Sequence, residues 1–263
     1  EDSVASSEKD AALTLVRNAL ITLDFYGAEK MVRINQLPKG LDELEQIIPH
    51  DVHVILIPKC ESRDQVVQVS DKIDEIIKQN GISSPATGED NCPVFLMPII
   101  ESALGVMNSM DIATAHPAVI ALAVGLEDYT ADLGVLRTDS GEESFFARSF
   151  IVNACKATGV TPIDTVYSDV ANSEGLRQSV LEAKKLGFEG KGCIHPRQVD
   201  VVHQAFMPTE GEITRAKKIV EAFEKAKQQG LGVVSLGSKM IDAPVVKRAQ
   251  KTVEMATKMG NIR

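Results

Sequence analysis

The chain of 263 residues is long enough for one α/β barrel or two small domains with a large buried core. Its net charge of -9 and its lack of tryptophan argue against nucleic-acid binding, which needs a basic surface and aromatic stacking. No apolar run reaches the roughly 20 residues that cross a bilayer, so we expect no membrane span. Its four cysteines show no metal-ligand spacing, which is typical of free thiols in the reducing cytoplasm.

Short apolar runs alternate with amphipathic stretches along most of the chain. The runs with the length of a strand cover residues 31–35, 53–58, 94–100, 119–124, 161–164 and 192–195. The second to fourth lack polar alternation, as strands covered on both faces do. Helical spacing marks residues 11–21, 66–77 and 176–186, the last closed by Gly187. This alternation predicts a parallel α/β sheet.

The number of strands fits an incomplete (β/α)₈ barrel, with an open doubly wound sheet as the alternative. The barrel is favoured because polar residues follow the carboxyl ends of the runs, where barrels gather their catalytic groups. These residues are Arg33, Lys59, Glu101, Asp128, Asp164 and His195. The chain opens on Glu1 and Asp2 without a methionine, so we expect a preceding segment that supplies the missing first strands and carries any targeting signal.

The regular alternation stops after His195. Thr209 and Glu212 form a capping box that predicts a helix, and a connector over residues 230–237 leads to a last helix beginning near Asp242. Residues 80–92 are polar and rich in turn formers, so we expect a surface loop there. We therefore predict a barrel over residues 1–205 and a helical extension over residues 206–263.

Two acidic residues follow neighbouring strands of the predicted sheet. Glu101 follows the third apolar run and Asp128 follows the fourth. Paired carboxylates suit Mg²⁺ and leave coordination positions for water and substrate, although each carboxylate could instead cap the helix after it. Gly125 permits a tight turn before Leu126 and Glu127, where backbone N–H groups could bind a substrate carboxylate.

Other polar residues are open to a functional and a structural interpretation. Arg33 lies within an apolar strand and needs an anionic partner, which is either a ligand or a structural ion pair. Lys59 is a substrate-binding candidate, with a local pair with Glu61 as the alternative. His195 is a candidate ligand or base, but we favour a structural histidine whose hydrogen bonds are satisfied by backbone at a strand end. Asp242 precedes Ala-Pro, a sequence typical of a helix N-cap.

Specific strings narrow the choice of family. They are EDSVASSEKDAA (1–12), VRIN (32–35), IPK (57–59), IESALGVMN (100–108), GLEDYTADLG (125–134), FARS (146–149), DTVYSDVANSEG (164–175), LGFEGKGCIHPRQVD (186–200) and GLGVVSLGSKMIDAPVV (230–246). In these strings the chain resembles the citrate lyase β-subunit family of metal-dependent aldolases and thioester lyases. The resemblance covers nearly the whole chain and stays in order.

The resemblance implies a fold and a set of site residues. The fold would be a (β/α)₈ barrel, assembled as a homotrimer whose C-terminal extension reaches a neighbouring active site. Glu101 and Asp128 would bind Mg²⁺, with Mn²⁺ as the alternative. Arg33 would contact the oxo-acid, and Asp242 would be the catalytic acid–base group from the adjacent subunit. The implied substrate-binding residues are Arg33, Leu126, Glu127, Asp128, Lys59, Glu1 and Asp2.

The resemblance also implies a reaction. The family cleaves a citryl thioester, carried on acyl carrier protein or coenzyme A, to oxaloacetate and an acetyl thioester. The expected partners are therefore the α and acyl carrier subunits of citrate lyase. The alternatives are a stand-alone citramalyl-CoA or malyl-CoA lyase that uses the same groups, and a non-catalytic scaffold subunit.

Overall fold

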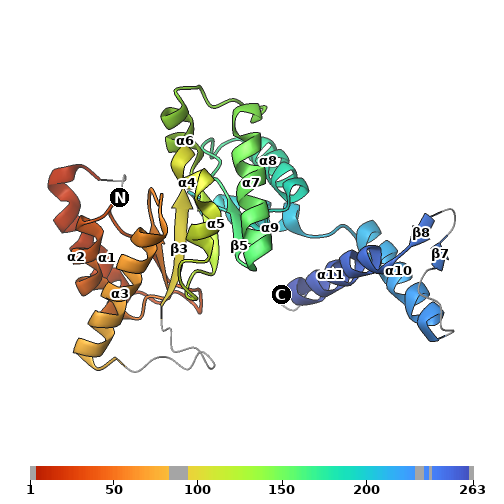
Figure 1. The fold of residues 1–263 in the computed structure, drawn as a ribbon, viewed down its shortest axis with the longest axis horizontal. Coiled ribbons are helices and arrows are strands. Elements are labelled where there is room, and N and C mark those ends of the chain that lie inside the picture. The colour runs from red at the N-terminus through yellow and green to blue at the C-terminus, as the bar shows by residue number, and fades with distance from the viewer. Residues whose placement is uncertain (1–3, 83–93, 229–233, 237–238, 261–263) are drawn as a thin grey trace. The chain divides into compact units, whose positions relative to one another are not determined.

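The computed structural model describes residues 4–82, 94–228, 234–236 and 239–260 (Figure 1). The site candidates Glu1 and Asp2 and most of the predicted loop over residues 80–92 lie outside these ranges. The chain divides into two compact units. The first runs through Ser168 and includes Glu182–Ile194, and the second comprises Asp169–Leu181 and the chain from His195 onward.

A parallel sheet of six strands organises the first unit. The strands are β1 (Met31–Arg33), β2 (Val54–Ile57), β3 (Phe95–Ile100), β4 (Ala121–Val124), β5 (Thr161–Asp164) and β6 (Gly190–Lys191). They pair in chain order, and the sheet curls into half of a barrel. A doubly wound sheet reverses its strand order at a switch point, whereas this order does not reverse. The sheet therefore follows the winding of a barrel.

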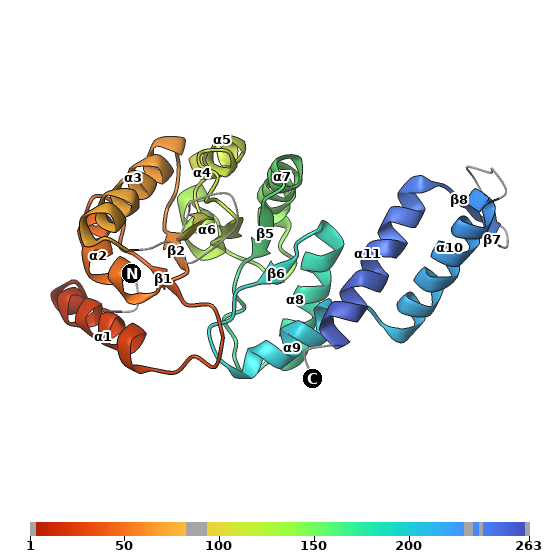
Figure 2. The ribbon, with the colours of Figure 1, turned by 90° about the horizontal axis from the view of Figure 1, so that it is seen from below.

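Helices cover the outer side of the sheet (Figure 2). They are α1 (Lys9–Thr22), α2 (Lys39–Ile47), α3 (Arg63–Asn80), α4 (Ala103–Met107), α5 (Ser109–Ala113) and α7 (Glu142–Thr158), with short 3₁₀ turns at Ser6–Glu8 and Ile48–His50. α6 (Leu126–Leu133) instead follows β4 at the carboxyl end of the sheet (Figure 1). The sequence defines the ends of α3 sharply, because Ser62 and Gln65 form a capping box and Gly81 ends the helix with a φ of 60°. The helices predicted near residues 11–21 and 66–77 are confirmed as α1 and α3.

The core of this unit lies between the sheet and its helices. Ile55, Leu96 and Leu122, from three successive strands, are fully buried, and so is Val66 of α3. Each buried aliphatic side chain of this size contributes about 1.5–3 kcal/mol. The burial of both faces explains why these strands read as continuous apolar runs.

The sixth predicted strand is displaced. We expected it at residues 192–195, but β6 is Gly190–Lys191, paired with Ile163 and Asp164 of β5. Cys193, Ile194 and His195 of the apolar run are exposed instead. The prediction was wrong because the buried residue of this strand is a lysine held by an ion pair, which hydrophobicity does not reveal.

The second unit contains a helical hairpin. α10 (Glu210–Gln228) and α11 (Ala243–Gly260) pack together through Ile219, Val246 and Ala249. The predicted capping box begins α10, since Glu212 N–H donates to Thr209 Oγ1 at 3.2 Å and Thr209 N–H to Glu212 Oε2 at 2.7 Å. The predicted connector over residues 230–237 is partly wrong, because β7 (Val234–Leu236) pairs with β8 (Lys239–Ile241) as an antiparallel ribbon.

Two further helices flank the sixth strand in the chain. α8 (Ser173–Leu186) ends before Gly187, whose φ of 105° fits the predicted helix end, and α9 (Arg197–Phe206) follows the sixth strand. Among the helices within the described ranges, none is long and apolar enough to cross a membrane.

Candidate active site

The candidate site lies at the carboxyl edge of the parallel sheet. Arg33 is the last residue of β1, and Lys59 follows β2 by two residues. Glu101 comes directly after β3, and Asp128 lies in the first turn of α6, just beyond β4. Because neighbouring strands are parallel, their carboxyl ends share one edge of the sheet.

Glu101 is a buried carboxylate, with 7% of the residue exposed. Its Oε1 atom accepts a hydrogen bond from the backbone N–H of Lys59 at 2.7 Å. It does not cap the next helix, because the N-cap of α4 is Ser102, whose hydroxyl accepts from Gly105 N–H at 3.1 Å. Glu101 is therefore held at the sheet edge by the neighbouring strand.

Gly125 gives the Glu101 carboxylate its space. A Cβ atom at Gly125 would lie 2.3 Å from Glu101 Oε2 and 2.8 Å from Glu101 Cβ, distances that real Cβ atoms do not reach. Gly125 N–H donates to Ile100 O at 3.0 Å, which fixes this approach. The glycine also precedes α6, which begins without a side-chain cap, so Asp128 is not the capping residue of that helix.

Lys59 contacts both predicted metal ligands. Its backbone N–H binds Glu101, and its Nζ atom lies 3.2 Å from Asp128 Oδ1. The residue has a φ of 45°, which is uncommon for a residue with a side chain and typical of functional sites. The Lys59 and Asp128 side chains are 36% and 41% exposed, so this half of the site is open to solvent.

The start of α6 is anchored by residues that the sequence did not indicate. Leu126 N–H donates to Thr165 Oγ1 at 3.4 Å, just after β5. Glu127 pairs with Arg137, whose Nη2 donates to Val166 O at 3.1 Å. Thr165 and Arg137 thus hold the turn that carries Asp128. Their partners lie 10 to 39 residues away in the chain, and we find no sequence signal that would have revealed the contacts.

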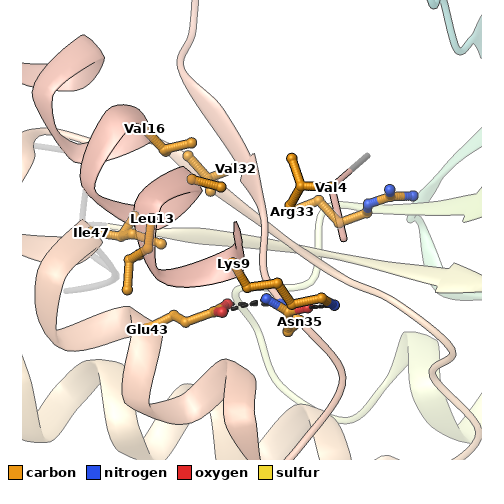
Figure 3. Close-up of a pocket in the computed structure, with 10 residues that line it drawn as sticks. Val4, Lys9, Leu13, Val16, Val32, Arg33, Asn35, Glu43 and Ile47 are labelled. Carbon is orange, nitrogen blue, oxygen red and sulfur yellow. Dashed lines mark hydrogen bonds between the residues drawn. The ribbon is translucent and has the colours of Figure 1, made fainter. Parts of the chain in front are cut away.

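Arg33 lines a cavity of about 80 Å³ between α1, β1 and α2 (Figure 3). On the other side of this cavity, Lys9 donates to Asn35, and Asn35 N–H donates to Glu43 Oε2 at 2.8 Å. Figure 3 shows the Arg33 side chain extending away from that polar group. Arg33 thus ends its strand opposite Leu56 of β2, at the same sheet edge as the carboxylates.

Asp164 belongs to a buried ion cluster. Its carboxylate accepts from Arg148 Nε and Nη2, both at 3.0 Å, and from Lys191 Nζ at 2.7 Å. Burial lowers the pKa of Lys191, against the opposing effect of Asp164. The sequence placed Asp164 at the rim but missed both cations. The signal available for Arg148 was its position within an apolar helix, where a buried arginine needs an anion.

His195 and Asp242 lie in the second unit. His195 is exposed, and its Nδ1 atom accepts from Arg197 N–H at 3.1 Å within a local turn, in agreement with the structural interpretation. Asp242 Oδ1 accepts from Val245 N–H at 3.2 Å, so the side chain caps α11. This cap uses one of the two carboxylate oxygens of Asp242, namely Oδ1.

The donor set at the sheet edge is chemically suited to a hard divalent cation. Glu101 and Asp128 supply carboxylate oxygens, which such cations prefer as ligands. The Asp128 carboxylate already pairs with one cation, the Lys59 ammonium. Within the described ranges, no group of three or more His, Cys, Asp and Glu side chains is placed to hold a metal. A cation here would have a pair of carboxylates and open positions.

The fold and the edge of the sheet define the class of this protein. The chain belongs to the HpcH/HpaI aldolase/citrate lyase family, whose sequence profile matches residues 1–196. The citrate lyase subunit beta of Escherichia coli K12 is 38% identical over 262 residues, covering 99% of this chain and 84% of that protein. The human mitochondrial citramalyl-CoA lyase is 32% identical over 269 residues, covering 98% and 77%.

Solved structures extend the comparison. The protein CitE of Mycobacterium tuberculosis, in complex with magnesium, acetoacetate and coenzyme A, has a TM-score of 0.77 at 26% identity, covering 98% of this chain and 87% of that one. The citrate lyase beta subunit of M. tuberculosis, complexed with oxaloacetate and magnesium, has a TM-score of 0.63 at 27% identity, covering 79% and 84%. A citrate lyase from Burkholderia xenovorans shares the fold at a TM-score of 0.82 and 20% identity, covering 99% and 82%.

Proposed function

We propose that this chain is a Mg²⁺-dependent carbon–carbon lyase that cleaves a citryl thioester to oxaloacetate and an acetyl thioester, as the β subunit of a citrate lyase. The observation that carries the proposal is the pair of carboxylates on neighbouring strand ends, Glu101 and Asp128, which contact the same lysine. The similarity to the E. coli β subunit supports the substrate.

Glu101 and Asp128 are the residues that would hold the metal. Their oxygens are the ligands that Mg²⁺ prefers, and Mn²⁺ accepts the same set. When bound, the metal supplies a Lewis acid that favours loss of the proton from the substrate hydroxyl. The backbone N–H of Lys59 and the space left by Gly125 aim the Glu101 carboxylate.

Side chains of the protein would handle the charge that moves during cleavage. The substrate hydroxyl loses its proton and becomes the ketone of oxaloacetate, while the electron pair of the broken carbon–carbon bond passes to the acetyl thioester as an enolate. The Arg33 guanidinium can stabilise the negative charge on either fragment. Asp242, delivered by a neighbouring subunit, would be the acid–base group that takes up the hydroxyl proton and then protonates the enolate carbon.

The substrate would be oriented at the start of α6. Leu126, Glu127 and Asp128 form the first turn of α6, at the helix end that favours anions. The N–H groups of Glu127 and Asp128 would bind a substrate carboxylate beside Leu126, whose own N–H donates to Thr165. The same substrate would be bordered by Lys59. It would also be bordered by Glu1 and Asp2, which lie outside the described residues. Arg137 and Thr165 would keep this turn in place.

The proposed assembly follows the family. Residues 1–205, with the six-stranded sheet, would form the barrel part of a (β/α)₈ fold, and residues 206–263 would form the extension that reaches a neighbouring site. We propose a homotrimer working with α and acyl carrier subunits in the cytoplasm. The free thiols Cys60, Cys155 and Cys193 fit that reducing compartment.

Substrate comparison tests the proposal against its nearest alternative. Oxaloacetate release from citryl-CoA in the presence of Mg²⁺ should exceed pyruvate release from citramalyl-CoA and glyoxylate release from malyl-CoA. The 32% identity to citramalyl-CoA lyase makes that enzyme the second candidate. If citramalyl-CoA is cleaved fastest, the citrate lyase assignment is wrong while the lyase class stands. A scaffold subunit would cleave none of the three.

Mixed subunits test the position of Asp242. Asp242→Ala and Arg33→Ala subunits should each be inactive alone. If a site is built from two chains, mixing the variants restores one intact site in some of the trimers. An absence of recovery after verified mixing would contradict the shared site.

A further inference from the structure

Lys59 contacts the two predicted metal ligands in two different ways. The bond to Glu101 comes from the backbone, and the contact with Asp128 comes from the ammonium at the end of a flexible side chain. We propose that the Lys59 ammonium is an internal counter-ion, which a divalent cation displaces from Asp128 when it binds between the carboxylates. The inference rests on the proposed metal site and adds an exchange of cations to it.

The geometry makes the ammonium and the metal competitors for one ligand. Nζ lies 3.2 Å from Asp128 Oδ1, within the distance of an ion pair. Without a metal, the site would bring two carboxylates together, and the ammonium offsets one of these charges. A divalent cation bound to the same carboxylate would repel the ammonium, because like charges a few ångströms apart destabilise each other.

The exposure of the pair allows the exchange. The Lys59 side chain is 36% exposed, so the ammonium can leave Asp128 and be hydrated without unfolding its surroundings. The backbone of Lys59 has no comparable freedom, since its N–H is held by the buried Glu101 carboxylate. Displacement therefore moves only the side chain, and Glu101 keeps its orientation in both states.

Metal-binding titrations of charge variants test the exchange. The free Mn²⁺ signal in electron paramagnetic resonance gives the dissociation constant without any substrate. Lys59→Met removes the competing cation and keeps a side chain of similar length, so we expect about tenfold tighter Mn²⁺ binding. Lys59→Arg retains the charge, serves as the matched control, and should bind within about threefold of the wild type. Equal or weaker binding by Lys59→Met would overturn the proposal.

Chemical labelling of the wild-type protein provides a second measurement that needs no variant. A brief pulse of an amine-acylating reagent, read by mass spectrometry, should modify Lys59 severalfold faster with Mg²⁺ than without it. Lys225 of α10, paired with Glu221 at 2.8 Å, is the internal control and should not change. Labelling of Lys59 that Mg²⁺ leaves unchanged or slows would contradict displacement.

Carboxylate variants separate this inference from the proposed function. Mn²⁺ binding should be lost in both Glu101→Gln and Asp128→Asn. If both variants bind Mn²⁺ as the wild type does, the proposed metal site is wrong and the exchange falls with it. If binding requires both carboxylates but Lys59→Met is not tighter, the metal site stands and only the exchange is wrong.

Discussion

The close approach of Gly125 to Glu101 makes a specific prediction for the substitution Gly125→Ala. The added methyl group would lie 2.3 Å from Glu101 Oε2 and 3.2 Å from Glu101 Cδ. Carbon–oxygen contacts below 3 Å are strongly repulsive, so either the carboxylate or the turn before α6 must move. Because Glu101 is buried and held by Lys59 N–H, its side chain has little room to yield.

The expected cost can be set against a matched substitution. Overpacking of this kind typically costs about 1–3 kcal/mol, so Gly125→Ala should lower the free energy of unfolding by that amount. Gly211 in α10 has an ordinary backbone conformation and no atom within 4 Å of a Cβ position. Gly211→Ala should therefore be neutral or stabilise by a few tenths of a kcal/mol, through the better helix propensity of alanine.

Two assays on the same variants check the prediction. Urea unfolding followed by circular dichroism gives the stability difference, and Mn²⁺ titration gives the effect on the site. We expect Gly125→Ala to bind Mn²⁺ at least tenfold more weakly than Gly211→Ala, because a displaced Glu101 loses the orientation that its hydrogen bond from Lys59 N–H gives it. Wild-type stability together with wild-type Mn²⁺ affinity in Gly125→Ala would refute the close approach and the role given to Glu101.

Two further predictions concern buried ionisable groups. Asp164→Asn leaves buried cations without a carboxylate and should lower the free energy of unfolding in urea by about 3–5 kcal/mol, whereas Lys191→Met keeps an arginine–carboxylate pair and should cost less than half as much. An equal cost for the two would contradict the ion cluster. Burial raises the pKa of Cys60 and Cys155 to about 12. The folded-state pKa of each thiol lies above the unfolded value of 9.0, so the unfolded chain ionises first as the pH rises. The free energy of unfolding therefore keeps its full value below pH 9 and falls between pH 9 and about 12, by up to about 1.4 kcal/mol per pH unit for each thiol. Unfolding in urea at several pH values measures how steeply the free energy of unfolding falls with pH, and Cys155→Ala should make this fall less steep. In a separate assay at pH 8, the exposed Cys193 should react with Ellman's reagent before either buried thiol.

Much of the fold could be predicted because burial leaves a pattern in a single sequence. The runs containing Ile55, Leu96 and Leu122 read as strands since both faces of the sheet are covered. The sixth strand could not be found in this way, because its buried residue is Lys191, whose partner lies 27 residues earlier. The β7–β8 ribbon was missed since glycines around a short apolar run are equally typical of a connector.

The candidate site shows the same limit. Glu101 and Asp128 could be selected because carboxylates after strands meet at one edge of a parallel sheet. The residues that hold these two carboxylates in place could not be predicted. The Lys59 contact with Asp128 spans 69 residues of sequence, and the anchoring of α6 by Thr165 and Arg137 depends on how separate loops pack. Long-range polar contacts of this kind leave no periodicity, so the structure was required to find them.

The central claim is that Glu101 and Asp128 hold the metal of a carbon–carbon lyase. The most direct measurement is the initial rate of oxaloacetate release from citryl-CoA, coupled to NADH oxidation by malate dehydrogenase, at increasing Mg²⁺ concentrations. The wild type should require Mg²⁺, and Glu101→Gln and Asp128→Asn should each lose about 10²–10³ in rate at any Mg²⁺ concentration that saturates the wild type. Release of oxaloacetate at the wild-type rate by both variants, or by the wild type after the metal is removed with EDTA, would contradict the account.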